Sequence, residues 1–300
     1  MAEAAANPAD RPSATLPGWD AGAIAQARAA LGHLEEAPAI PSDTAAFDTL
    51  FAVQPVGAPD PTHVTAYYEP VLQARRARSD AFPVPILGKP SATAPLPDRA
   101  AIMNGALEGM APALYWLADP VDLYFLQIQG SGRLRLDDGS LVRLGYGGAN
   151  GHPYVSIGRI MREEGVLGRG GGGMRGWLRA DRARGMAMMA RNPSYIFFAE
   201  NRALRPEDGP VGAMGLPLPA GAAIAVDPEH HAYGGLFWLA FDEPDGTAVR
   251  RIVMAMDTGA AIKGAARVDW FVGTGDAAGH RARRINTEGR LYRLLPRSAP

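Results

Sequence analysis

The spacing of hydrophobic residues changes from helical to strand-like near Val64. Before that point, apolar residues recur at helical spacing in AGAIAQARAALGHLEE (21–36) and in DTAAFDTLFAV (43–53), where Asp43 is placed to cap the helix. From Val64 onward, short extended runs are broken by proline, as in VTAYYEPVLQA (64–74). The pattern therefore predicts two amphipathic helices packed outside a sheet, followed by a β-rich region.

Helical patterns reappear inside this β-rich region. They predict helices over 97–110, with Asp98 as the cap, over 155–165 and over 174–192. The runs YFLQIQG (124–130) and LVRLGYGGANG (141–151) are typical of strands, and the second ends in a glycine turn.

The last third of the chain is nearly all strand. Short apolar runs alternate there with turns, in the order AAIAVD, GGLFWLAF, RRIVMAMD, ARVDWFV and LYRLLP. That spacing predicts a small closed β-barrel.

Composition narrows the class of protein. A chain of 300 residues that is 47% hydrophobic can bury the core of one large or two ordinary domains. The formal net charge of −1 provides no global attraction to nucleic acid, so we expect no nucleic-acid partner. Cysteine is absent, which excludes disulfides, thiol nucleophiles and thiolate metal sites.

The N-terminal residues show no periodicity. Residues 1–17 are alanine, proline and polar residues, so we expect a disordered leader. No basic start leads into an apolar core as in a signal peptide, and nowhere do 18 apolar residues run uninterrupted. We therefore expect no membrane insertion of this chain.

Asp257, Thr258 and Gly259 follow an apolar strand, as in half of an aspartic protease site. Such a protease pairs two aspartates that share a proton, yet Asp-Thr-Gly occurs once in this chain, which is far longer than a dimeric protease requires. The other interpretation is that Asp257 caps a turn in which Gly259 takes a positive φ.

Several motifs together are more specific than any one of them. In order and spacing they resemble the membrane-bound lytic murein transglycosylase A family, over roughly Val64 to Pro296. The segments are TAYYEP (65–70), YFLQIQGSGRLRLDDG (124–139), GYGGANGHPY (145–154), NPSYIFF (192–198), GLPLPAGAAIAVD (215–227) and DTGAAIKGAARVDWFVGTGDAAGH (257–280).

The resemblance implies a mainly β fold with peripheral helices. A double-psi β-barrel would comprise 18–71 and 211–300, and a smaller β-rich domain, 72–210, would be inserted into it, with a groove for a glycan between the two. The last segment resembles a "3D" domain, named for three aspartates that match Asp257, Asp269 and Asp276.

The resemblance also implies the chemistry. The family cleaves the β-1,4 bond between N-acetylmuramic acid and N-acetylglucosamine in peptidoglycan without water and leaves a 1,6-anhydromuramoyl end. Its catalytic acid corresponds to Asp269. Ordinary glycosidases need two carboxylates, but here the 6-hydroxyl of the muramic acid attacks its own C1. One aspartate can then act first as acid and afterwards as base.

Such an acid must hold its proton near neutral pH, which calls for apolar surroundings. On a strand, Asp269 shares one face with Phe271, whereas Val268 and Trp270 point the other way. Arg267 also shares that face, and pairing with it would lower the pKa of Asp269. The residues alone leave both interpretations open.

Other polar residues are candidates for support and binding. Asp257, which ends a strand, is expected to orient the catalytic acid, and Asp276 to cap a turn. Gln127 and Gln129 would share one face of a strand, where two amides seldom belong to an apolar core. Only one of Tyr67 and Tyr68 can face a groove. The substrate-binding candidates are Tyr67, Tyr68, Gln127, Gln129, Ser131, Tyr146, Asn150, Asp227 and Lys263.

We expect no metal and no cofactor. Adjacent His230 and His231 would point to opposite faces of a strand, so they predict a surface turn instead of a metal site. We expect a monomer that binds peptidoglycan glycan strands, with Asp269 within about 15 Å of the Gln127/Gln129 face.

The chain departs from the family pattern at three points. Ala66 and Ala260 stand where the family has glycine, and the lipid-bearing cysteine is missing. Resemblance suggests a periplasmic or outer-membrane-associated protein, but the chain shows neither signal peptide nor lipobox. The alternatives to a lytic transglycosylase are a non-catalytic peptidoglycan-binding module and an aspartic protease.

Overall fold

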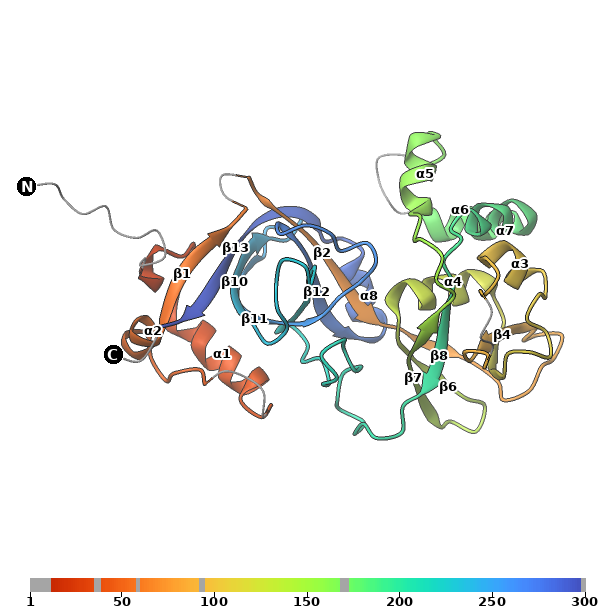
Figure 1. The fold of residues 1–300 in the computed structure, drawn as a ribbon, viewed down its shortest axis with the longest axis horizontal. Coiled ribbons are helices and arrows are strands. Elements are labelled where there is room, and N and C mark those ends of the chain that lie inside the picture. The colour runs from red at the N-terminus through yellow and green to blue at the C-terminus, as the bar shows by residue number, and fades with distance from the viewer. Residues whose placement is uncertain (1–11, 35–38, 58–59, 92–94, 168–172, 298–300) are drawn as a thin grey trace, which may run out of the picture. The chain divides into compact units, whose positions relative to one another are not determined.

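The computed structural model describes residues 12–34, 39–57, 60–91, 95–167 and 173–297. The chain divides into two compact units. The first unit joins the residues up to Tyr68 to those from Arg205 onward, and the second is the continuous segment Glu69–Leu204. Two segments far apart in sequence, red-orange and blue in Figure 1, therefore fold together.

The first unit contains a closed β-barrel. Its strands are β1 (Phe51–Val56), β2 (Thr62–Glu69), β9 (Ala223–Ala225), β10 (Leu236–Asp242), β11 (Ala248–Asp257), β12 (Arg267–Thr274) and β13 (Asn286–Pro296). The order is β1-β13-β10-β11-β9-β12-β2, and β2 also pairs with β13, which closes a ring of six strands and leaves β1 outside it. Strands β9 and β11 run parallel, whereas β13 runs antiparallel to β1, β10 and β2. The predicted barrel is confirmed.

Alternation along the strands gives the barrel two apolar faces. Val268 and Trp270 of β12 belong to a buried cluster to which all six barrel strands contribute, so this cluster fills the interior. Phe271 points the other way and packs in a second cluster with Tyr67. The predicted division of β12 into two faces, with Asp269 on the Phe271 side, is confirmed.

Two helices cover part of the outer cluster. They are α1 (Ala21–Leu31) and α2 (Thr44–Leu50), capped by the side chains of Asp20 and Asp43. The two predicted helices and the Asp43 cap are confirmed, except that residues 51–53, predicted as the end of the second helix, begin strand β1. The predicted disordered leader is wrong at its end, because a 3₁₀ turn forms at Ser13–Thr15 and Leu16 is buried in the same cluster. Residues 1–11 of that leader lie outside the described residues.

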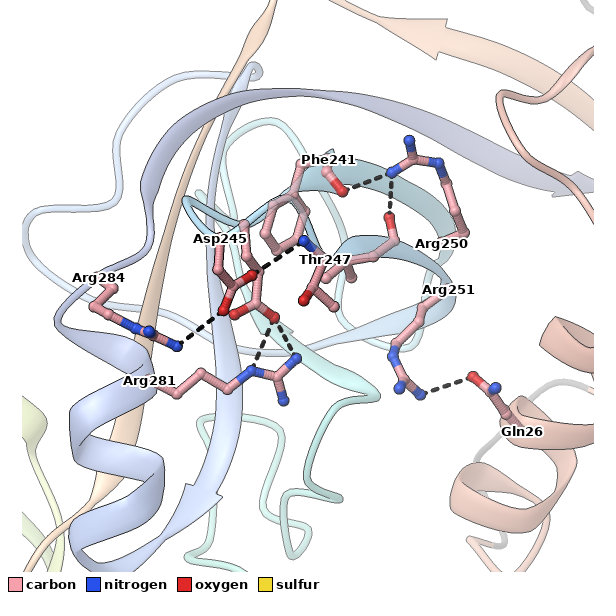
Figure 2. Close-up of polar contacts among 10 residues, drawn as sticks. Gln26, Phe241, Asp245, Thr247, Arg250, Arg251, Arg281 and Arg284 are labelled. Carbon is pink, nitrogen blue, oxygen red and sulfur yellow. Dashed lines mark hydrogen bonds and ion pairs between the residues drawn. The ribbon is translucent and has the colours of Figure 1, made fainter.

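The sequence pattern missed helix α8 (Gly275–Ala282), which is attached to the hairpin of β10 and β11. Arg281 of α8 donates to the buried carboxylate of Glu243 at 2.5 and 2.9 Å. Figure 2 shows Arg284, just after α8, donating to Asp245. On the other side of the hairpin, Arg251 donates to Gln26 of α1 at 2.8 Å.

The second unit is built from a four-stranded sheet in the order β3-β6-β7-β8, the pair β4–β5, and helices. The strands are β3 (Val71–Gln73), β4 (Val84–Leu87), β5 (Ala113–Leu117), β6 (Gly132–Arg135), β7 (Leu141–Ala149) and β8 (Ile196–Glu200). The helices are α3 (Arg99–Met103), α4 (Pro120–Gln129), α5 (Ile157–Glu163), α6 (Met174–Ala180) and α7 (Arg182–Ala190). Strand β7 and the Asp98 cap of α3 are as predicted.

One predicted strand is wrong: residues 124–130 belong to helix α4 and its C-cap. Asp119 caps the helix ahead of Pro120, and Gly130 ends it with a φ of 76°. Because α4 is buried on several sides, its apolar run shows no helical stripe, and periodicity cannot distinguish such a run from a buried strand. The helix predicted over 174–192 is also interrupted, at Asp181, which caps α7.

A search of the described residues finds no helix that is both long and apolar enough to cross a membrane. The mainly β fold with peripheral helices agrees with the prediction.

Candidate active site

The carboxyl group of Asp269 is held by hydrogen bonds among side chains of the barrel strands. It lies near the start of β12 opposite Ala225 of β9, and its Oδ1 accepts a hydrogen bond of 2.5 Å from the Thr65 hydroxyl on β2. Arg267 in turn donates from Nη2 to the Thr65 oxygen at 2.8 Å. Thr65 therefore lies between the guanidinium and the carboxyl group, and its own proton is directed to Asp269.

Burial is the largest influence on the pKa of Asp269. It raises the pKa of this carboxyl above its usual value, whereas the Thr65 hydrogen bond and the Arg267 charge lower it by smaller amounts. The charge of Asp257 adds a further upward contribution. The sequence left open whether apolar surroundings raise the pKa of Asp269 or Arg267 lowers it. The pKa is raised, and the Arg267 charge reduces the size of this increase.

Asp257 forms a second carboxyl site at the end of β11. Its Oδ2 accepts a hydrogen bond of 2.9 Å from the Tyr67 hydroxyl, and its Oδ1 accepts one of 3.0 Å from the Ala213 amide. Burial also raises the pKa of Asp257, against these hydrogen bonds. The pKa of Tyr67 is raised well above its usual value by burial and then by the Asp257 charge. Tyr67 is therefore a hydrogen-bond donor and not a proton source at neutral pH.

The turn after Asp257 differs from the prediction. Asp257 does accept backbone N–H groups, but Gly259 is not among the glycines with positive φ in the described chain. The chain therefore turns here without the left-handed residue that an isolated Asp-x-Gly suggested.

Asp227 supports the loop that follows Asp257. Its Oδ2 accepts from the Gly264 amide at 2.8 Å, and Lys263 Nζ lies 3.5 Å from Oδ1. The Gly264 hydrogen bond is the main cause of its lowered pKa. Asp227 is buried and its carboxylate binds this loop, while the side chain of Lys263 is 63% exposed.

The predicted surface turn at the two histidines is only half right. His230 is exposed, but His231 is buried and lies edge-on to Phe237. Its Nε2 is 2.8 Å from the Ala265 carbonyl, which requires a proton on that nitrogen. Across the described ranges, no three histidine or acidic side chains gather in a way that could hold a metal ion.

Asp276 does not cap a turn as predicted. It lies exposed in the first turn of α8, and the N-cap position belongs to Thr274. A negative charge in this turn favours the helix through its dipole.

The two glutamines of the second unit do not share a face. They lie on helix α4, where residues two apart point in nearly opposite directions. Gln127 is buried, and its Oε1 accepts from Arg99 at 2.5 Å while its Nε2 donates to the Ile196 carbonyl. Arg99 also donates to the carbonyls of Asn192 and Ser194. Gln127 is thus part of an internal brace, whereas Gln129 is partly exposed at the helix end.

Asn150 is likewise an internal brace. Its Nδ2 donates to the carbonyls of Pro97 and Pro193 at 2.9 Å each, and its Oδ1 accepts from the Tyr195 amide at 2.8 Å. The side chain is buried and joins three segments of the second unit. These bonds leave Asn150 little freedom to contact a sugar.

The remaining binding candidates differ in exposure. Tyr146 on β7 is 62% exposed, whereas Ser131 is buried at the start of β6. Tyr67 and Tyr68 point to opposite sides of β2, as predicted: Tyr67 contacts Asp257, and the ring of Tyr68 packs so tightly on α8 that a Cβ at Gly279 would lie 2.6 Å from it. The placement of Asp269 opposite Gln127 and Gln129 stays a prediction, since these residues belong to different units.

Thr65 and Ala213 were missed by sequence reasoning. Thr65 is within the motif TAYYEP, but a single threonine on a strand carries no signal of its own. Ala213 contributes only its backbone amide, which no side-chain pattern can reveal.

Comparison with known proteins identifies the family. The family described as "MltA specific insert domain" matches residues 63–199, and the family described as "3D domain" matches 222–295. A crystal structure of MltA from Neisseria gonorrhoeae is 32% identical to this chain, with a TM-score of 0.75 over 97% of this chain and 91% of that one. The chain belongs to the MltA family.

Other MltA proteins are also similar to this chain. The membrane-bound lytic murein transglycosylase A of Vibrio cholerae is 31% identical over 248 residues, which are 79% of this chain and 66% of that protein. The chain thus spans slightly less than two thirds of that relative's length. A structure of Escherichia coli MltA with bound chitohexaose is 28% identical, with a TM-score of 0.76 over 93% of this chain and 84% of that chain.

Proposed function

We propose that this chain is a lytic transglycosylase that cleaves the β-1,4 bond between N-acetylmuramic acid and N-acetylglucosamine in peptidoglycan. The observation that carries the proposal is Asp269, a carboxyl group whose pKa is raised by burial on the outer face of the barrel. Membership of the MltA family and the names of its relatives support the same activity.

Asp269 performs both proton transfers. In its protonated form it donates to the glycosidic oxygen as the bond to C1 of the muramic acid breaks. The resulting carboxylate then takes the proton of the 6-hydroxyl of the same sugar while that oxygen bonds to C1. The proton count balances, no water is consumed, and the product is a 1,6-anhydro ring. Because the nucleophile belongs to the substrate, its effective concentration is on the order of 10⁵ M or more.

Thr65 and Arg267 position the acid. The Thr65 hydroxyl binds Oδ1 of Asp269 and so orients the carboxyl group, which leaves its other oxygen for the substrate. Once Asp269 has lost its proton, this hydrogen bond and the charge of Arg267 stabilise the carboxylate. The same two groups therefore favour the second half of the reaction, in which Asp269 is a base.

Asp257 and Tyr67 act beside Asp269. The negative charge of Asp257 raises the pKa of the acid, and the Tyr67 hydroxyl holds Asp257 in place. A carboxylate here also faces the positive charge that develops at C1 in an oxocarbenium-like transition state. We infer an orienting and electrostatic role for Asp257, not a proton transfer.

Glycan binding would use exposed side chains. Tyr146 of the second unit and Lys263 of the first are proposed to contribute stacking and charge. The internal bonds of Gln127 and Asn150 make these two residues braces of the second unit. The chitohexaose-bound relative is consistent with a β-1,4 glycan as the ligand class. We further propose a periplasmic or outer-membrane-associated protein, since the relatives are named membrane-bound. A monomer is part of the same proposal.

The decisive experiment digests purified peptidoglycan in ¹⁸O-labelled water. A lytic transglycosylase releases muropeptides with anhydro ends and without ¹⁸O, whereas a hydrolase releases reducing ends that carry one ¹⁸O. Asp269→Asn should release neither, and the exposed Asp60→Asn serves as the matched control with full activity. No release by the wild-type chain, with retained binding to peptidoglycan, would identify a non-catalytic binding module. Cleavage of a peptide substrate would identify a protease.

A further inference from the structure

A cavity of about 380 Å³ opens on the first unit where β1, β10 and β13 meet. Its apolar lining includes Phe51, Leu236, Phe237 and Leu294, and one long cationic side chain, Arg293, also lines it. The volume falls within the range of sites that hold small ligands, and a mostly apolar wall with one charged group is their usual composition. None of these residues belongs to the proposed acid site.

Arg293 is fixed by neutral acceptors. Its Nη2 donates to the His230 carbonyl at 3.2 Å and to Nδ1 of His231 at 3.0 Å, and its Nη1 donates to Oε1 of Gln54 at 3.5 Å. Nδ1 of His231 can accept a hydrogen bond because the ring proton lies on Nε2, which donates to the Ala265 carbonyl. Among the ion pairs between described residues, none includes Arg293. The structure thus holds a guanidinium in a set orientation beside an apolar cavity, and no carboxylate in the described part of the chain forms an ion pair with it.

The cavity lies at the same end of the barrel as Asp257. Gly234 and Gly235, which line it, exchange backbone hydrogen bonds with Ala255 of β11 at 2.9 Å each. Asp257 ends β11 two residues later. Since a strand advances about 3.3 Å per residue, one wall of the cavity begins only a few ångströms along the sheet from Asp257.

We propose that this cavity binds a free carboxylate of a peptide stem on the glycan, with alanine methyl groups against its apolar wall. The inference rests on the proposed function, because peptidoglycan carries short acidic peptides rich in alanine. A guanidinium has five N–H donors, and the neutral acceptors take three of them, so donors remain for a charge-assisted hydrogen bond to a carboxylate. Charge complementarity selects a carboxylate-bearing peptide over an uncharged sugar as the occupant.

Direct binding tests the cavity apart from catalysis. An acidic peptide ending in alanine should bind the full chain in calorimetric titration, and Arg293→Gln should weaken this binding about tenfold or more. Arg293→Lys should restore part of the affinity because it keeps the charge. Arg290→Gln, which makes the same change on the same strand, is the matched control and should bind as the wild type. Equal affinity of Arg293→Gln and wild type would overturn the proposal.

A second variant covers the case in which Arg293→Gln fails to fold. Ala232 is exposed at the cavity wall, and Ala232→Trp should fill the space while leaving Arg293 in place. Loss of peptide binding with an unchanged melting temperature supports the assignment, and unchanged binding contradicts it.

Kinetic measurements on two substrates distinguish failure of this proposal from failure of the proposed function. On intact peptidoglycan, Arg293→Gln should raise KM, whereas on glycan stripped of its peptides it should match the wild type. Equal losses on both substrates would mean a structural role and would overturn the assignment. If the wild type cleaves neither substrate, the proposed function fails, while peptide binding still decides the fate of the cavity.

Discussion

The Thr65 hydroxyl donates a hydrogen bond of 2.5 Å to Oδ1 of Asp269, although 204 residues separate the two in sequence. Closure of the barrel brings them together, since β2 and β12 are neighbours in it. Through Thr65 the acid is also linked to Arg267. The geometry of a single carboxyl group, and its affinity for a proton, thus depend on how the barrel closes.

Asp269→Asn should abolish cleavage, because the amide fills the same space but has no transferable proton. General acid catalysis contributes about 10² to 10⁴ in rate, so we expect a loss of at least 10²-fold in kcat. Binding of a glycan oligomer, measured by calorimetry, should be retained. A similar, modest loss in Asp269→Asn and Asp257→Asn would contradict a single acid.

The same variant should alter stability in a pH-dependent way. Because burial raises the folded-state pKa of Asp269, ionising it opposes folding: its contribution is most favourable below the unfolded pKa, near 3.8, and is lost as pH rises through the folded pKa. Removing the titrating group should leave the melting temperature of Asp269→Asn equal to or above that of the wild type at neutral pH. Thermal melts across acid and neutral pH measure the difference. A lower melting temperature at neutral pH would contradict burial as the dominant cause.

Thr65→Val should change the pH profile of the reaction. The Thr65 hydrogen bond lowers the pKa of Asp269, so its removal raises that pKa further. Since the acid must be protonated in the free enzyme, the alkaline limb of kcat/KM should move to higher pH, with a lower maximum because the carboxyl group is less well oriented. Thr65→Ser should restore the wild-type profile. An unshifted limb in Thr65→Val would count against this positioning role.

Tyr67→Phe should reduce activity less than Asp269→Asn does. The phenylalanine ring keeps the contact with Phe271, whose centroid lies 5.3 Å from that of Tyr67, but it loses the hydrogen bond to Asp257. A hydrogen bond of this kind contributes about 1 kcal/mol or somewhat more to stability, which chemical denaturation can measure. The activity of the Tyr67→Phe/Asp257→Asn double variant should be no lower than that of the less active single variant, because Tyr67 acts through Asp257.

Tyr146→Ala and Asn150→Ala should have opposite signatures. Tyr146 is largely exposed, so its loss should raise KM without changing the melting temperature, and the exposed Leu141 of the same strand offers Leu141→Ala as the control. Asn150→Ala leaves two carbonyls and an amide without their buried partner, at a cost of about 3 kcal/mol. Denaturation and kinetics on both variants test the distinction. A destabilised Tyr146→Ala with normal KM would mean that Tyr146 does not bind the glycan.

Local patterns along the chain were sufficient for part of the structure. Alternation predicted that Asp269 and Phe271 lie on one face of β12 and Trp270 on the other, because side-chain direction on a strand repeats every two residues. The helix caps at Asp43 and Asp98 could also be predicted, because a cap depends only on residues within one turn. Helix α4 could not be predicted, because it is too deeply buried to show a polar stripe.

Tertiary structure alone decided how the candidate site works. The contacts of Asp269 with Thr65 and of Asp257 with Tyr67 join residues 204 and 190 positions apart, and no local pattern records such pairs. The raised pKa values likewise result from burial by distant segments, which outweighs the neighbouring Arg267. The sequence by itself determined which residues face the same way on each strand and in which order the motifs occur. Barrel closure determined which of these faces meet, because water is excluded from a carboxyl group only when several strands and loops assemble around it.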